Sequence, residues 1–152
     1  MLVVVTNPGV KSLVVSAAMM SVAAALTSTA VARADDALYK FQSPSGNIAC
    51  FLGADNGGGV ACDIRHHTYP IPAMPATCQL DWGDRFELES GGAPALHCHG
   101  DTLQIGGLQT LDYGQSLQAG TISCESQPEG IECSDSTTHH SFFVSRDRYE
   151  LN

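Results

Sequence analysis

Basic and aromatic residues are scarce in this chain. Seven of the 152 residues are Lys or Arg, against 16 Asp or Glu, and aromatic residues make up 7% of the sequence. A protein this acidic is repelled by the phosphates of nucleic acid and by anionic lipid surfaces, so we exclude nucleic acid as a partner. Because large aromatic side chains are few, the sequence predicts a modest hydrophobic core.

Helical periodicity and common catalytic motifs are also missing after residue 34. No window there shows sustained apolar spacing of three and four, and Gly or Pro interrupts most segments. The Gly-x-Ser-x-Gly nucleophile turn, the Ser-x-x-Lys pair and a phosphate-binding Gly loop do not occur. We therefore expect no cofactor and no catalytic residue, and a binding role rather than an enzymatic one.

The first 34 residues have the layout of a secretory signal peptide. Lys11 precedes an uncharged stretch over 12–32, and Ala32-Arg33-Ala34 fits the small-any-small cleavage pattern. A membrane anchor is the alternative, but much of the stretch is Ala, Ser and Thr and no basic stop follows. We expect cleavage after Ala34, a single domain over 35–152 without stable membrane insertion, and a secreted, extracellular or cell-envelope location. The cleaved chain keeps five basic and all 16 acidic residues, a formal charge of −11.

All six cysteines lie in the predicted mature chain. In an exported protein an even number of cysteines predicts a disulfide framework. The alternative is zinc, but the spacings within the first and the last pair exceed the two to four residues typical of zinc ligands. We therefore favour disulfides among Cys50, Cys62, Cys78, Cys98, Cys124 and Cys133.

A cysteine pattern occurs twice, at 46–62 and at 120–133. Each copy reads Gly, any, Ile, small, Cys, then a polar turn, then Gly, Val or Ile, any, Cys. Alternation at period two places Ile and Cys on one face of a strand, and the turn-rich middle predicts a hairpin. Facing cysteines in such a hairpin have Cα atoms about 4.5 Å apart, close enough for a disulfide. The favoured pairs are Cys50–Cys62 and Cys124–Cys133, which leaves Cys78–Cys98.

Strand-like segments recur about every 8–12 residues between turn sequences. They predict an all-β fold, a small disulfide-stapled antiparallel sandwich or barrel built from β-hairpins. Three prolines at 70, 72 and 75 exclude the segment 68–78 from a central strand. A hairpin turn is expected at Gly91-Gly92. The expected strands are 38–41, 47–52, 59–64, 85–89, 95–99, 102–106, 121–125, 130–134, 140–145 and 148–151.

Five stretches in order carry a resemblance to a known family. Phe41–Cys50 reads Phe-x-Ser-Pro-Ser-Gly-Asn-Ile-x-Cys, and it is followed by Gly-Val-Ala-Cys at 59–62, Leu111–Gly114, the second cysteine repeat and a Phe-x-x-Ser-Arg stretch. Together they resemble a family of small secreted proteins from actinobacteria, notably mycobacteria. The resemblance implies export and a shared fold, but no activity is assigned to that family. The chain departs from it at 138–142, where the family has Gly-His-Gly-Phe, so we carry no role over to a histidine there.

Histidines are the main candidate metal ligands, with Asp101 or Asp63 as a candidate carboxylate ligand beside them. His97 and His99 are two residues apart and share one face if they lie on a strand. With His66 or His139 as a third ligand, they form a set that Zn²⁺ or Cu²⁺ accepts. The alternative is a group of exposed polar residues around a disulfide, and we expect no resident metal.

Two further groups are candidates for function. Asp81, Asp84 and Glu87 are close in sequence, and paired carboxylates catalyse glycoside hydrolysis, so a small hydrolase is an alternative to a solvated acidic surface. Trp82, the single Trp, and Tyr69 are candidate ligand contacts, because exposed aromatic rings stack on sugars or anchor protein partners. We expect the partner to be a component of the cell envelope or of a host.

Overall fold

The computed structural model describes residues 38–152, and the predicted signal peptide lies outside the described residues. Strands and turns make up this part of the chain, with one short 3₁₀ helix. The elements are β1 (Tyr39–Gln42), β2 (Ile48–Gly53), η1 (Asp55–Gly57), β3 (Gly59–Ile64), β4 (Arg85–Glu89), β5 (Ala95–Leu96), β6 (Gln109–Thr110), β7 (Ser116–Ala119), β8 (Ile122–Ser126), β9 (Gly130–Asp135), β10 (Ser141–Ser145) and β11 (Tyr149–Leu151).

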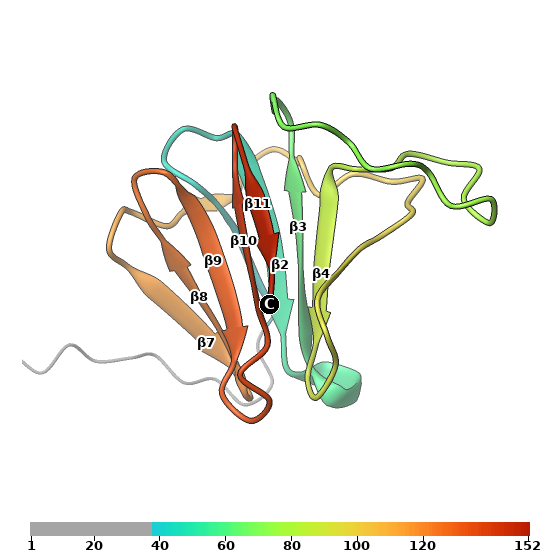
Figure 1. The fold of residues 1–152 in the computed structure, drawn as a ribbon. Coiled ribbons are helices and arrows are strands. Elements are labelled where there is room, and N and C mark those ends of the chain that lie inside the picture. The colour runs from blue at the N-terminus through green and yellow to red at the C-terminus, as the bar shows by residue number, and fades with distance from the viewer. Residues whose placement is uncertain (1–37) are drawn as a thin grey trace, which may run out of the picture.

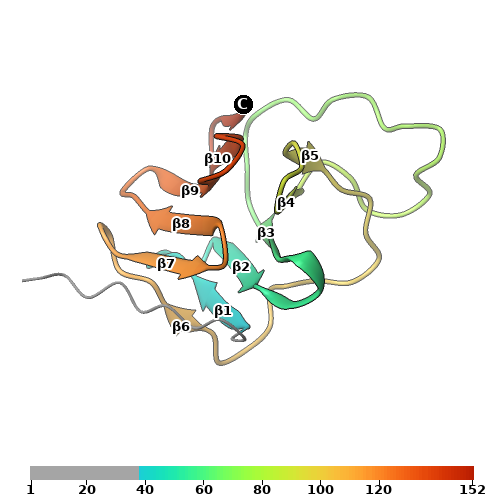
Figure 2. The ribbon, with the colours of Figure 1, turned by 90° about the horizontal axis from the view of Figure 1, so that it is seen from below.

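Two sheets pack face to face, so the predicted all-β sandwich is confirmed (Figure 1). The first sheet has the order β5-β4-β3-β2-β1-β6, and the second has the order β11-β10-β9-β8-β7. Neighbouring strands are antiparallel except for β1 and β6, which are parallel. The view from below shows the two layers end-on (Figure 2). Apolar side chains on the facing surfaces of the layers therefore form the core.

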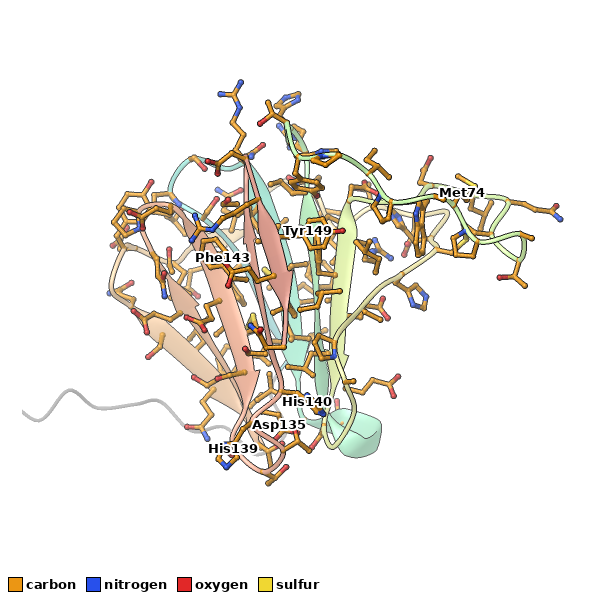
Figure 3. All side chains as sticks on the ribbon, viewed as in Figure 1. Met74, Asp135, His139, His140, Phe143 and Tyr149 are labelled. Atoms are coloured by element: carbon orange, nitrogen blue, oxygen red, sulfur yellow. A yellow bond between two sulfur atoms is a disulfide. The ribbon has the colours of Figure 1, made fainter. Side chains whose placement is uncertain are left out.

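Alternating side chains from both sheets fill that core. Phe86 of the first sheet and Phe142 of the second are fully buried, with ring centroids 6.0 Å apart. One edge of the sandwich is closed by aromatic rings, because Tyr149 lies 5.0 Å from Tyr69 and 5.3 Å from Phe86 between ring centroids. Figure 3 shows Tyr149 on β11, on the side of that strand that faces β4. Burial alternates residue by residue along β8, whereas β2 and β10 bury consecutive residues.

Disulfides join the cysteines in the predicted pairs. Cys50–Cys62 links facing positions of β2 and β3, and Cys124–Cys133 links facing positions of β8 and β9, each with Cα atoms 4.1 Å apart. All four of these sulfurs belong to fully buried residues of the core. Cys78–Cys98 ties the proline-containing loop to the segment after β5. Three disulfides indicate that the protein resides in an oxidising, extracellular environment. Within residues 38–152, no helix is long and apolar enough to cross a membrane.

A buried ion-pair network holds the long loop between β5 and β6. Arg85 Nε and Nη2 bind the two carboxylate oxygens of Asp63 at 2.6 and 3.0 Å, and Nη1 lies 2.7 Å from Asp101 Oδ1. The backbone N–H of Leu103 donates to Asp63 Oδ2 at 2.7 Å. Asp63 and Arg85 are both buried, so each compensates the charge of the other.

His99 extends this network from the loop side. Its Nδ1 lies 2.7 Å from the carbonyl oxygen of Asp101, and its Nε2 lies 3.0 Å from Asp84 Oδ1. Burial acts to lower the pKa of His99, but the bonds to the Asp84 carboxylate and the Asp101 carbonyl outweigh it and raise the pKa. A carbonyl only accepts, so Nδ1 is a donor, and an ionised Asp84 requires Nε2 to donate as well. The geometry therefore favours the doubly protonated ring.

The end of the sandwich at the β9–β10 turn is closed by a buried carboxylate (Figure 3). Asp135 Oδ2 accepts from the Gly91 N–H at 2.6 Å, and Oδ1 accepts from the Thr137 N–H and hydroxyl at 2.8 and 2.7 Å. The Gly91 N–H, then the Thr137 N–H, hold the pKa of Asp135 well below its usual range. Because Gly91 follows β4 and Asp135 ends β9, this carboxylate joins the two sheets.

Two details of the predicted strand pattern are wrong. The expected strand at 102–106 does not form, because Leu103 N–H bonds to Asp63 and the Ile105 N–H bonds to the Leu103 carbonyl. The expected strand at 95–99 is limited to β5, with a single further bridge at His99. The sequence reasoning also missed β6 and β7, which lack β-branched runs and exist because they pair with β1 and β8.

Candidate functional site

A pocket of about 470 Å³ lies at the end of the sandwich where β2 begins and β3 ends, the upper end in Figure 1. Its walls come from five separate turns and connections, two from the first sheet, two from the second and one that links them. We call it the motif-end pocket. The lining residues are Ser43, Ser45, Gly46, Asn47, Ile48, Arg65, His66, Tyr113, Gln127, Pro128, Glu129, Gly130 and Arg146.

The Ser-Pro-Ser-Gly-Asn motif builds one wall as a hydrogen-bonded turn. Ser43 Oγ accepts from the Ile48 N–H at 3.1 Å, and the Gly46 N–H donates to the Ser43 carbonyl at 2.8 Å. Gly46 has φ +67°, a left-handed conformation that glycine adopts without strain. The Asn47 side chain bonds both backbone groups of His66, each at 2.9 Å. The motif thus acts as a scaffold that fixes the position of the segment 65–66.

The opposite wall is formed by the β8–β9 and β10–β11 turns. Gln127 and Gly130 exchange two backbone hydrogen bonds around Pro128 and Glu129. A Cβ at Gly130 would lie 2.1 Å from the carbonyl oxygen of Val144, so only glycine allows this close approach of β9 to β10. The Thr68 N–H donates to the Arg146 carbonyl at 2.6 Å and joins this wall to the first sheet. Both walls are therefore fixed by backbone contacts.

Positive charge at the pocket stands out against the acidity of the chain. Arg65 and Arg146 are two of the five basic residues among residues 38–152, and both line the pocket. Arg65 Nη2 bonds the amide oxygen of Gln104 at 3.1 Å. Within the described part of the chain, neither arginine has a carboxylate oxygen within 4.0 Å, whereas Arg85 and Arg148 do. Two guanidinium groups therefore remain available for a ligand.

A second, more open hollow of about 550 Å³ lies along β2, β3 and β4. Its lining includes the acidic residues Asp55, Glu87 and Glu89 and several glycines, and contains no basic residue. It offers no exposed aromatic ring comparable to Tyr113, which is 50% exposed at the motif-end pocket. The motif-end pocket is therefore the better candidate for a binding site.

Comparison with known proteins places the chain in a family. The sequence matches a family of unknown function, DUF6636, over residues 18–152, most of its length. The chain belongs to DUF6636. No curated protein and no solved structure matches it. The match agrees with the expected membership of an uncharacterised family. Because the function of DUF6636 is unknown, the geometry of the pocket is the guide to the function of this chain.

The candidate metal ligands occupy separate positions in this DUF6636 chain. His97 Nδ1 lies 2.9 Å from Glu87 Oε2, and both nitrogens of His99 are engaged in the buried network. His66 lines the motif-end pocket, whereas His139 lies in the β9–β10 turn at the other end (Figure 3). Among residues 38–152, no group of three or more His, Cys, Asp or Glu side chains is arranged to hold a metal ion.

The acidic candidates also have different surroundings. Asp84 is bonded to His99, Glu87 is paired with His97, and Asp81 is exposed. None of these three carboxylates lines the motif-end pocket. Among the described residues, Asp84 and Glu87 are thus partners of histidines; Glu87 lines the second hollow, and Asp81 and Asp84 line neither of the two pockets.

Tyr69 and Trp82, the two aromatic candidates, hold the proline-containing loop. Tyr69 is 5% exposed, so its ring belongs to the core and the idea of an exposed contact is corrected; its hydroxyl donates to the Gly83 carbonyl at 3.0 Å. Trp82 is partly buried, and its indole N–H donates to the Pro72 carbonyl at 3.1 Å. The loop itself extends away from the sheets and exposes Ile71 and Met74 (Figure 3).

The residues that matter most at the pocket were not singled out from the sequence. Arg65, Arg146 and Tyr113 lie in three turns that are distant along the chain, and only the fold brings them together. Two signals were available: Tyr113 and Arg146 lie within stretches that carry the family resemblance, and Arg65 and Arg146 are two of only five basic residues in the mature chain.

Proposed function

We propose that this protein is an exported binding domain, without enzymatic activity of its own, that takes a ligand into the motif-end pocket. The observation that carries the proposal is a pocket of about 470 Å³ whose walls are fixed by backbone hydrogen bonds across both sheets. That volume falls in the range of small-molecule sites, and rigid walls reduce the entropy cost of binding.

Export and the source of the ligand form the second half of the proposal. The three disulfides support export, and so does the arrangement of residues 1–34 as a signal peptide. The likeness of the motifs to small actinobacterial secreted proteins supports a ligand from the cell envelope or from a host. Among the described residues that line the pocket, no serine hydroxyl is hydrogen-bonded to the His66 ring, as a nucleophile and its base would be. This supports binding over catalysis.

Titration of the ¹⁵N-labelled mature chain, residues 35–152 with its disulfides intact, tests the proposal. The probes are a panel of neutral and charged monosaccharides and amino acids. We expect saturable changes in amide chemical shift on the turns at 45–47, 65–66, 127–130 and 146. Substitution Tyr113→Ala at the pocket weakens this binding, and Met74→Ser on the projecting loop serves as the matched control. Shift changes confined to the loop, or chemical turnover of a probe, would contradict the proposal.

A further inference from the structure

Electrostatic contrast within the molecule points to the kind of ligand. Arg85 is bound by two carboxylates, Arg148 pairs with Glu150 at 3.1 Å, and Lys40 lies over the Phe51 ring. Among residues 38–152, Arg65 and Arg146 have no such carboxylate, and both line the motif-end pocket. An acidic chain that leaves two guanidinium groups at one pocket attracts an anion to that place.

The arginine-bearing segments are held in place before any ligand arrives. Gln104 accepts from Arg65 Nη2 through its side-chain oxygen and donates through Nε2 to the carbonyls of Asn47 and Asp63 at 3.2 and 3.0 Å. The Arg65 N–H donates to the Asn47 carbonyl at 2.9 Å, and the Arg146 carbonyl accepts from Thr68. Guanidinium groups on fixed backbone bind planar or tetrahedral oxyanions with two parallel hydrogen bonds at low entropic cost.

Tyr113 supplies a second recognition element at the same pocket. It is half exposed and lies on the connection between β6 and β7, which is tied to β8 by the Gly114 N–H donating to the Ser126 carbonyl at 2.7 Å. An exposed tyrosine ring offers a flat apolar face with a polar tip, suited to stacking on a sugar ring. Most of the other lining residues are polar, with Ile48 and Pro128 as apolar side chains, so the pocket presents polar groups together with apolar surface, as a sugar requires.

We propose, building on the proposed function, that the motif-end pocket binds an acidic sugar, with its carboxylate or phosphate group between Arg65 and Arg146 and its ring against Tyr113. Glu129 is the single carboxylate in the lining, and it opposes the anion. The negative charge of Glu129 therefore lowers the affinity for the acidic sugar, and a neutral side chain at position 129 should raise it.

Isothermal titration calorimetry of the mature, disulfide-bonded chain with four probes tests this inference. The probes are glucuronic acid, glucose 6-phosphate, glucose and inorganic phosphate. We expect at least one of the two acidic sugars to bind about tenfold tighter than glucose and than inorganic phosphate, since charge-assisted hydrogen bonds are the strong ones. Glucuronic acid and glucose 6-phosphate distinguish a carboxylate from a phosphate as the anchoring group.

Four substitutions make the test specific to the two guanidinium groups. Arg65→Gln and Arg146→Gln each weaken binding of the acidic sugar about tenfold. Arg148→Gln, on a neighbouring exposed arginine that is paired with Glu150 and does not line the pocket, leaves it unchanged. Glu129→Gln tightens binding about threefold, an increase that unfolding cannot mimic.

Three results would overturn the inference. They are equal binding of glucose and the acidic sugars, unchanged binding in the Arg65→Gln, Arg146→Gln double variant, and inorganic phosphate that binds as tightly as the tighter-binding acidic sugar. If glucose alone binds with shift changes on the pocket turns, the inference fails while the proposed function stands. If no probe of the larger panel binds at the pocket, both fail.

Discussion

Two groups of charged side chains lie next to each other in this fold and differ in whether their charges are compensated. In the buried network, Arg85 is held by Asp63 and Asp101, whereas at the motif-end pocket Arg65 and Arg146 have no carboxylate within 4.0 Å among the described residues. Gln104 touches both groups. Arginine side chains thus stabilise the fold where carboxylates surround them, and at the motif-end pocket they are left without a carboxylate for the ligand that we propose.

The largest expected effect on stability comes from a substitution in the buried network, where the charges are compensated. Arg85→Ala leaves Asp63 buried without a counter-charge and releases the loop 97–108, so we expect the free energy of unfolding to fall by about 3–5 kcal/mol. Denaturant unfolding measures it. Arg148→Ala is the control, because its pair with Glu150 is exposed and changes stability by less than about 1 kcal/mol. A loss below 1 kcal/mol for Arg85→Ala would show that the network does not hold the loop.

A second large effect is expected at the closed end of the sandwich. Asp135→Ala removes the acceptor of the Gly91 and Thr137 N–H groups and lowers stability by about 2–3 kcal/mol. Because the folded pKa of Asp135 is depressed, its contribution is present above the ordinary Asp pKa near 4 and is lost as the pH falls further. In denaturant unfolding, the free energies of unfolding of the wild type and of Asp135→Ala should therefore approach each other as the pH falls below about 4. A difference that stays constant down to pH 2 would contradict this account.

A smaller effect is the pH dependence of the network through His99. Its folded pKa is raised, so its contribution is complete below about pH 6.5 and is lost as the pH rises through the folded value. The charged groups around the ring are Asp84, Arg85 and Asp101. Unfolding curves between pH 6 and 9 should show wild-type stability falling relative to His99→Gln. If the two proteins keep a parallel pH dependence, His99 does not titrate in this range.

The smallest effect on stability is expected on the uncompensated side. Arg65→Gln and Arg146→Gln should each change the free energy of unfolding by less than about 0.5 kcal/mol, because both side chains are exposed and no carboxylate is left unpaired. Denaturant unfolding measures these changes, as it does for Arg85→Ala. Destabilisation beyond 1 kcal/mol by either change would mean that these arginines support the fold and are not reserved for a ligand.

Local chemistry explains why much of the fold was predictable from the sequence. The two cysteine repeats contain both strands of a hairpin and its turn, so the pairs Cys50–Cys62 and Cys124–Cys133 follow from alternation within about fifteen residues. By contrast, the Leu103 backbone N–H bonds to the Asp63 carboxylate, 40 positions away in the sequence. Strand β7 likewise forms through its backbone pairing with β8. No local pattern reports partners of that kind.

The pocket shows the same limit more strongly. Its walls come from residues near 46, 65, 113, 128 and 146, and their proximity depends on how the two sheets face each other. The resemblance motifs mark five stretches of chain, yet the Ser-Pro-Ser-Gly-Asn side chains stabilise the turn itself, with Asn47 bonded to the His66 backbone. Tyr69, chosen as a contact for its aromatic ring, proved to be a core residue.

The disulfides join the cysteines in consecutive order along the chain, first with second, third with fourth and fifth with sixth. If the chain crosses a membrane with its N-terminus first, both cysteines of each native pair are therefore exposed to oxidation before the next pair follows. Simple vectorial oxidation reaches the final connectivity without reshuffling, so assembly of this protein should not depend on a disulfide isomerase.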